Sequence, residues 1–174
     1  MYAEAANYEN ARSLYLKKWR RLKRQGRTFA YVDESGFASS AQRDYGWARI
    51  GEKVPGRRSG LRKAPTSLLA ALIGKQLVEP MLFEGTCDTE TINTWLEERL
   101  CPALKKGTVI VMDNVSFHQS QRTKDIIRAA DCEILFLPPY SPDFMPIERK
   151  FATLKRHRSY NASMKLDEII KSFG

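Results

Sequence analysis

Hydrophobic positions along the chain gather in short runs, separated by stretches in which apolar and polar residues alternate at helical spacing. The runs TFAYV (28–32), TVIVM (108–112) and CEILFL (132–137) have the length and composition of buried strands. SLLAALIG (67–74) is a further strand candidate, and LVEPMLFEG (77–85) is a weaker one. The pattern therefore predicts a sheet with a largely apolar interior.

Further segments have the periodicity of helices. Asp88–Leu104 carries an apolar stripe, and Asp88 is placed to cap its first turn. Gln119–Ala130 reads as another helix, and a basic helix closes the chain. Residues 36–60 contain five glycines and suggest short antiparallel strands joined by turns. Strands that alternate with helices after such a section predict an α/β fold, a mixed sheet with helices on its faces.

Residues 1–27 are predicted to form a basic amphipathic helix, an N-terminal arm ahead of one domain over 28–174. Residues 1–28 hold eight Lys and Arg against two Glu, which is +6 of the net charge of +9. Gly26 suits the end of this helix. Two interpretations stay open: an arm that faces DNA or a partner, and a solvated helix docked by its apolar stripe, which consists of Tyr8, Ala11, Tyr15, Trp19 and Leu22.

Charge and cysteine content narrow the class of protein. The net charge of +9 and the sequence pI of about 9.6 favour a polyanionic partner, because clustered cations gain affinity by releasing counterions from phosphate backbones. A merely basic soluble protein is the alternative. The three cysteines form no CxxC pair, so we expect reduced thiols in the cytoplasm. No apolar run reaches the roughly 18 residues of a membrane span, and we expect no membrane partner.

Three carboxylates occupy similar local positions. Asp33 and Asp113 each end an apolar strand, and Glu148 lies in the first turn of the last helix, after a loop with four prolines. Acids at the carboxyl edge of neighbouring strands converge, and the stiff loop fixes where Glu148 arrives. Carboxylate-only sites suit Mg²⁺ or Mn²⁺, and two ions roughly 4 Å apart can clamp an in-line phosphoryl displacement. Each acid taken alone has a simpler explanation: an Asp after a strand often only forms a turn, and a Glu in a first helical turn often only interacts favourably with the helix dipole.

Other polar residues are candidates for supporting roles. Asn114 and His118 follow Asp113 and could hydrogen-bond a phosphate or a catalytic carboxylate, or merely form a turn and a satisfied core network. Glu34 points to the opposite side of an extended chain from Asp33 and is predicted to be structural. The expected phosphate-binding cations, each with a solvated surface position as the alternative, are Arg57, Arg58, Lys155, Arg156 and Arg158.

The motifs YVDESGF, VIVMDNVSFH and LPPYSPDFMPIERKFATLK, in this order, closely resemble those of DDE transposases of the mariner-related superfamily, especially the bacterial insertion-sequence branch. GWARIGEKVPGR and the FEGT and TINTWLEERLCPAL stretches are also similar to that branch. Thirty-four residues separate Asp113 from Glu148, which matches the spacing in that group. The resemblance covers about residues 28–158.

The resemblance implies a ribonuclease H-like five-stranded fold with Asp33, Asp113 and Glu148 as the catalytic, metal-binding triad. It implies Mg²⁺-dependent cleavage at transposon ends, with Mn²⁺ as a substitute, then attack of the freed 3′-hydroxyl on target DNA at TA dinucleotides. It also implies a homodimer on double-stranded DNA in a bacterial, nucleoid-associated setting. A ribonuclease H-like nuclease without strand transfer and an inactive relic that only binds DNA are the rival hypotheses.

Two departures from the family pattern stand out. The family normally carries an N-terminal helix-turn-helix region, which is expected to come from another chain, from a split or frameshifted gene, or to be lost. The family loop usually reads PDLNPIE, whereas this one reads PDFMPIE. Met145 cannot cap the following helix as Asn would, so Asp143 is the candidate cap and a weakly defined helix start is expected.

Overall fold

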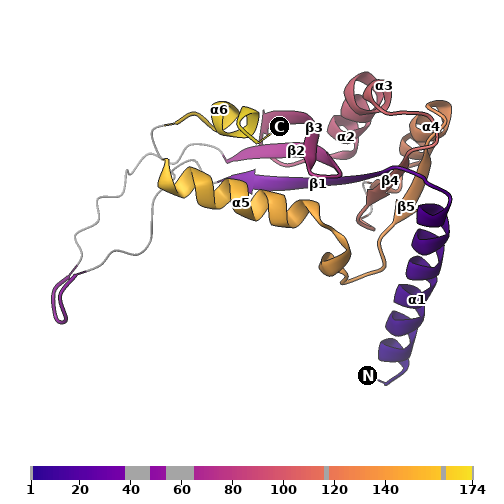
Figure 1. Ribbon diagram of the computed structural model, residues 1–174, viewed down its shortest axis with the longest axis horizontal. Coiled ribbons are helices and arrows are strands. Elements are labelled where there is room, and N and C mark those ends of the chain that lie inside the picture. Colours follow the sequence, from indigo (N-terminus) through magenta and orange to yellow (C-terminus); the bar gives the residue numbers. More distant parts are fainter. Residues whose placement is uncertain (1, 38–47, 54–64, 116–117, 162–163, 174) are drawn as a thin grey trace.

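A mixed five-stranded sheet forms the centre of the computed structural model, which describes residues 2–37, 48–53, 65–115, 118–161 and 164–173 (Figure 1). The strands lie in the order β3-β2-β1-β4-β5. β1 pairs antiparallel with β2 on one side and parallel with β4 on the other, so the sheet is mixed. The strands are β1 (Phe29–Phe37), β2 (Thr66–Ile73), β3 (Gln76–Glu84), β4 (Val109–Met112) and β5 (Glu133–Phe136).

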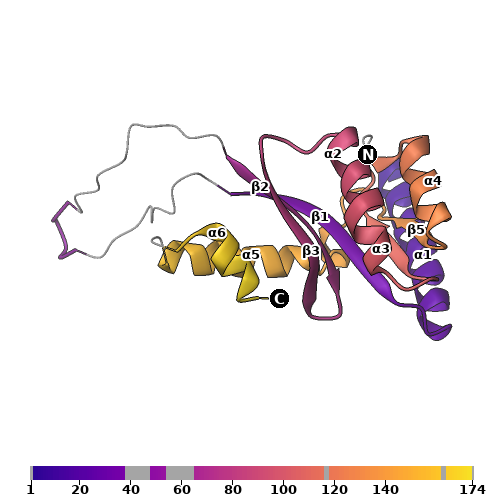
Figure 2. The same ribbon diagram turned by 90° about the horizontal axis from the view of Figure 1, so that it is seen from above.

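Helices cover both faces of this sheet, which confirms the predicted α/β class (Figures 1 and 2). One apolar core lies between the sheet and α1, α5 and α6, and the other lies between the sheet and the α2, η1, α3 and α4 segments. The helices are α1 (Tyr2–Arg24), α2 (Thr89–Trp95), the π-helical η1 (Leu96–Leu100), α3 (Cys101–Ala103), α4 (Gln121–Ala129), the 3₁₀ turn η3 (Pro142–Phe144), α5 (Ile147–Tyr160) and α6 (Leu166–Lys171).

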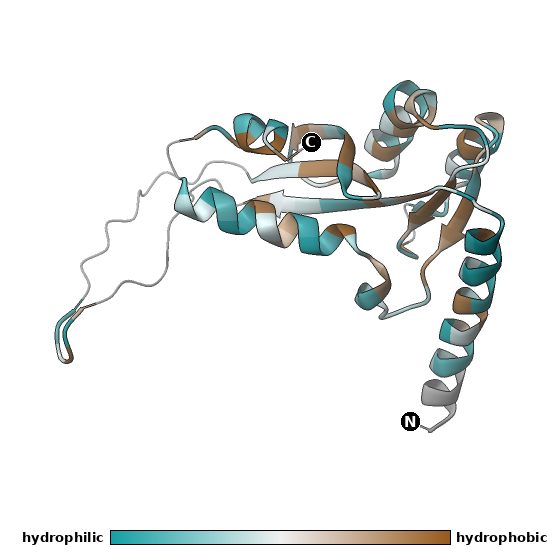
Figure 3. Ribbon diagram, viewed as in Figure 1, coloured by the Kyte–Doolittle hydropathy of each residue, from teal (hydrophilic) through white to brown (hydrophobic). Residues whose placement is uncertain are grey.

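The alternation of side chains along each strand divides the sheet residues between these two cores. On β4, Val109 and Val111 face α5, whereas Ile110 and Met112 face the α2 side, and all four are fully buried. Figure 3 shows β4 and most of β5 as hydrophobic, in contrast to the mostly hydrophilic α1. A strand buried on both faces reads as a continuous apolar run, which is why sequence pattern alone located β4.

β1 is longer than the sequence pattern predicts. The expected strand ended at Asp33, but β1 continues to Phe37 because its antiparallel pairing with β2 runs from Ala30 to Phe37. Its parallel pairing with β4 stops at Tyr31↔Val111. Asp33 therefore lies inside β1, at the level where β4 ends. Of the antiparallel section expected over 36–60, residues 38–47 and 54–60 lie outside the described residues.

Two predicted helix boundaries can be checked directly. Asp88 caps α2, as predicted, because its side chain accepts from the Thr91 amide at 2.8 Å. Gly26 follows α1 with a φ of +71°, a left-handed conformation that glycine adopts without strain. No helix in the described part of the chain is long and apolar enough to span a membrane.

Helix α1 packs on the end of the sheet near β5. Tyr15 and Leu22 of its apolar stripe are buried in the core shared with α5, and Trp19 donates to the Tyr31 hydroxyl at 3.0 Å. Lys18 also pairs with Glu133 of β5 at 3.0 Å. The apolar stripe thus docks on the domain, while the proposed boundary at residue 27 stays a prediction.

Candidate active site

Asp33 and Asp113 lie side by side on the face of the sheet that α5 covers. Each stands two positions past the last parallel pair, Tyr31↔Val111, so register and side-chain alternation bring both to the same level and the same face. Asp113 comes directly after β4, as predicted. Glu148 reaches this face from the first turn of α5, which packs against β1.

The three acids line one cleft of about 460 Å³. The β5–α5 loop forms its opposite wall, and Asn114 lies on its rim. The loop residues in this wall are Leu137, Pro138, Pro139, Tyr140, Ser141, Pro142 and Met145. Because proline restricts the backbone, this wall is stiff. The structure therefore brings the three sequence-predicted acids together, from two strands and a helix that lie far apart along the chain.

The cleft gathers acidic side chains around Asp33. Burial raises the pKa of Asp33 to about 7, and the nearby carboxylates of Glu34, Asp113 and Glu148 contribute to this rise. The Asp33 carboxyl group therefore stays protonated up to a pH well above its ordinary pKa of 3.8. A buried acid among other acids is stabilised in its charged form only when a cation joins it, so this pKa marks a candidate functional site.

His118 lies close to Asp113 in the cleft and also to Glu34, which faces the other side of the sheet. It is fully buried, its Nδ1 lies 2.5 Å from Oδ1 of Asp113, and its Nε2 lies 3.9 Å from Oε2 of Glu34. Burial raises the pKa of Glu34, and Asp113 adds to the rise, while His118 opposes it. His118 is placed to orient the Asp113 carboxylate.

Glu34 is the residue whose surroundings sequence reasoning described least well. It does face away from Asp33, as predicted, but its carboxylate approaches His118 rather than standing apart from the site. His118 lies beside both acids: the sequence offered it as a partner for a catalytic carboxylate, but no sequence signal indicated its approach to Glu34.

The chain that forms this cleft matches a known protein family. The family model described as DDE superfamily endonuclease matches residues 28–170. The chain belongs to this family. A search of curated protein sequences returns no match to it.

Solved structures share the fold of this DDE domain. The Mos1 transposase paired-end complex with left transposon end matches with a TM-score of 0.71 and 18% identity, over 87% of this chain and 48% of that one. The Mos1 strand transfer complex matches with 0.68 and 16%, over 94% and 55%. The catalytic domain of Mos1 mariner transposase matches with 0.56 and 15%, over 88% and 70%. The fold is therefore ribonuclease H-like, and the chain spans about half the length of the first two proteins.

The donor set of the DDE domain fits a hard divalent cation. The described residues contain no group of three or more His, Cys, Asp or Glu side chains arranged to hold a metal ion as they stand. The cleft nevertheless offers carboxylate oxygens from Asp33, Asp113 and Glu148, and a cation among them would offset the mutual repulsion of these acids. Mg²⁺ typically takes one or two carboxylates and completes its shell with water and substrate phosphates.

The start of α5 differs from the sequence-based expectation. Asp143 does not cap the helix: it pairs with Arg12 of α1 instead. The residue at the N-cap position is Pro146, which makes no side-chain cap hydrogen bond, and Met145 is buried in the core. The helix start is therefore positioned by packing and by the loop before it, rather than by a capping side chain.

The predicted DNA-binding cations divide into described and undescribed ones. Lys155 and Arg156 are exposed on α5. Lys155 Nζ and the Arg158 guanidinium each lie 5.7 Å from the ring centroid of Phe37, and burial lowers the pKa of Arg158. Arg57 and Arg58 lie outside the described residues. The roles of all five stay predictions.

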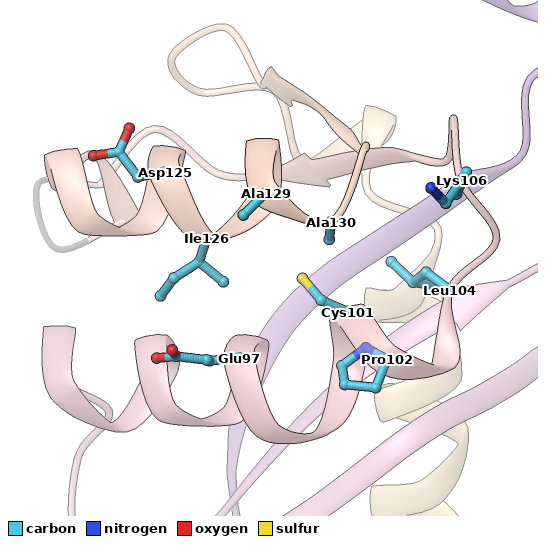
Figure 4. A pocket seen from close by; sticks show the side chains of 9 residues that line it. All are labelled: Glu97, Cys101, Pro102, Leu104, Lys106, Asp125, Ile126, Ala129 and Ala130. Carbon is cyan, nitrogen blue, oxygen red and sulfur yellow. The ribbon is translucent and has the colours of Figure 1, made fainter.

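A larger cavity lies away from the three acids. It measures about 610 Å³ and opens between α4 and the η1–α3 segment, on the side of the sheet opposite to α5. Figure 4 shows Ile126 and Cys101 pointing into the space between these helices. Its lining is mostly apolar and does not gather three acids as the cleft does. The smaller cleft is therefore the candidate active site.

Proposed function

We propose that this chain is the catalytic domain of a DDE transposase, which cleaves DNA strands at transposon ends and joins the 3′-hydroxyl to target DNA. The observation that carries the proposal is the convergence of Asp33, Asp113 and Glu148 on one cleft within a domain of the DDE endonuclease family. The related Mos1 structures are complexes with transposon ends and a strand transfer complex. Membership in the bacterial insertion-sequence branch stays a prediction.

In this mechanism Asp33 and Asp113 jointly hold a divalent ion, and Glu148 completes a second site. Mos1 structures with Mg and with Mn support this choice of ions. A pair of such ions would supply Lewis acidity for in-line displacement at phosphorus. His118, in contact with Asp113, would keep that carboxylate oriented toward the cleft. Asn114, whose Oδ1 accepts from Gln119 at 2.7 Å, would be held at the rim near the DNA phosphates.

The basic surface around the cleft would bind the DNA backbone. Lys155, Arg156 and Arg158 on α5 continue from Glu148 along the same helix, so a strand whose phosphate reaches the acids would pass these cations. We also propose double-stranded DNA as the partner, a homodimer in the active complex and a separate helix-turn-helix region for end recognition. We also propose a cytoplasmic, nucleoid-associated location in a bacterium, which rests on the resemblance to the bacterial insertion-sequence branch.

A joining assay tests the proposal. The chain is incubated with supercoiled plasmid, Mg²⁺ or Mn²⁺, and a labelled DNA duplex that carries the transposon end. A transposase yields nicked plasmid and transfers the label into it, and the matched duplex with a 3′-dideoxy end transfers none. Nicking that never yields joined product in the presence of cognate ends would indicate a nuclease without strand transfer. DNA binding with neither product would indicate an inactive relic and would refute the proposal.

A further inference from the structure

The loop that leads to Glu148 is held by helix α1, which lies ahead of the part of the chain that matches the family model. Arg12 grips Asp143 with two nitrogens: Nη1 lies 2.9 Å from Oδ1 and Nη2 lies 2.6 Å from Oδ2. The same Nη1 donates to Oγ of Ser141 at 3.0 Å. Such a forked pair fixes direction as well as distance, because the guanidinium is planar.

Aromatic packing extends this contact along the loop. The ring of Phe144 stacks on Tyr15 of α1, with centroids 5.1 Å apart and planes 14° apart. The Arg12 guanidinium lies 4.3 Å from the centroid of the Phe144 ring. Phe144 is therefore fixed by α1 through a stacked ring and a cation–π contact.

A third contact restrains the cleft wall itself. The Tyr8 hydroxyl donates to the carbonyl oxygen of Tyr140 at 2.9 Å and accepts from Arg12 Nη1 at 3.1 Å. Tyr140 has a φ of +51°, which is uncommon for a residue with a side chain and needs support from its surroundings. Its hydrogen bond to α1 provides such support.

The loop depends on these contacts because α5 lacks a capping side chain. Glu148 lies five positions after Asp143, and its amide donates to the Met145 carbonyl at 3.2 Å. The Phe144 and Met145 amides donate to Ser141 and Pro142 at 3.1 and 2.9 Å. A shift of Asp143 would therefore pass through two short turns directly to Glu148.

We propose that Arg12 is a positioning residue for Glu148: by clamping Asp143 to α1, it fixes where Glu148 enters the cleft beside Asp33 and Asp113. The catalytic task of Glu148 rests on the proposed function, whereas the clamp itself does not. Helix α1 is then part of the active-site architecture of this chain rather than a separate basic arm.

The contacts of Arg12 distinguish this role from direct DNA binding. Its side chain is only 22% exposed, and its donors are directed at Asp143, Ser141 and Tyr8. The Arg12 guanidinium also holds the pKa of Asp143 below its ordinary value. Arg20 and Arg21 on the same helix are exposed and are the better candidates for phosphate contacts.

Hydrogen exchange of the free protein tests the clamp without DNA or metal. Arg12→Ala and Asp143→Ala should each speed exchange at the amides of Phe144, Met145 and Glu148 by about tenfold or more, because the turns that protect these amides lose their anchor. The double variant should exchange no faster than either single one. Arg20→Ala, a charge removal on the exposed side of α1, should leave these amides unchanged. Unchanged exchange in Arg12→Ala would overturn the proposal.

Kinetics then test the consequence for Glu148. Arg12→Ala should lower kcat for DNA cleavage by about 10–100-fold, the cost of a misplaced catalytic group, with DNA affinity within about twofold of wild type. Arg12→Lys should be nearly as slow because it lacks the fork, and the exchanged pair Arg12→Asp with Asp143→Arg should recover part of the rate. Arg12→Lys also serves as the test variant if Arg12→Ala fails to fold.

The opposing outcomes have distinct signatures. If Arg12 bound a phosphate, its removal would weaken DNA binding and reduce the salt dependence, and Asp143→Ala would not reproduce the defect. That pattern would overturn the clamp. A wild-type chain without any cleavage would refute the proposed function, and the exchange measurement would still decide whether Arg12 holds the loop.

Discussion

Asp113→Asn is expected to abolish metal-dependent DNA cleavage, with a loss on the order of 10³-fold or more, and to leave the thermal midpoint close to that of wild type. The substitution keeps the shape of the side chain and its contact with His118, which lies 2.5 Å from Oδ1. It removes the charge that the proposed ions require, because a neutral amide is a poor ligand for Mg²⁺. Plasmid nicking with Mg²⁺ and with Mn²⁺ measures the loss, and a melting curve checks the fold.

Asp125→Asn is the matched control for this experiment. Asp125 is exposed on α4, on the side of the sheet opposite to the cleft, and pairs with Arg128 at 3.2 Å. Its replacement removes the same charge without touching the three acids, so nicking should persist. Cleavage by Asp113→Asn at the wild-type rate would remove Asp113 from the catalytic set and with it the proposed metal site.

Asp33→Asn should stabilise the metal-free protein while it abolishes cleavage. The folded-state pKa of Asp33 is about 7, above its ordinary value of 3.8, so between these values the folded protein binds more protons than the unfolded chain. Stability therefore falls as pH rises from about 4 to about 7, and the deficit persists above that range. Asn carries no such penalty, so its advantage over Asp should grow across the same window.

Melting curves from pH 4 to pH 8 without metal measure this effect. The midpoints of the two proteins should lie close together near pH 4, and Asp33→Asn should melt higher by pH 8, by about 2–4 °C for each kcal/mol regained. Added Mg²⁺ should raise the wild-type midpoint more than that of the variant. A difference between the proteins that does not change with pH would show that Asp33 titrates normally. A side chain that serves function is expected to lower the stability of the folded protein in this way.

Local sequence was sufficient for the parts of the site that local physics determines. The apolar runs located β4 and β5, and Asp113 could be placed because the residue after a buried strand emerges at the sheet edge. The position of Asp33 was only partly predicted. The pairing of β1 with β2, which carries the strand on to Phe37, depends on residues 29 to 43 positions away.

Long-range contacts account for what sequence could not predict. Arg12 is one of eight cations in the N-terminal 28 residues, and its partner Asp143 lies 131 positions away. Asp143 read as a helix cap because capping is a local signal, and the competing ion pair with α1 is not. In the same way, nothing in the sequence around Glu34 indicates that His118 lies 3.9 Å from its carboxylate.

A calorimetric Mn²⁺ titration in the presence of duplex DNA tests the central claim, that Asp33, Asp113 and Glu148 converge to hold divalent metal, most directly. Wild type and Asp113→Asn are titrated side by side, since DNA phosphates bind Mn²⁺ in both and complete the coordination that the carboxylates begin. The structure predicts a saturable component in wild type that the variant lacks. Identical binding curves for the two proteins would contradict the claim, because they would show that the cleft acids take no part in holding the ion.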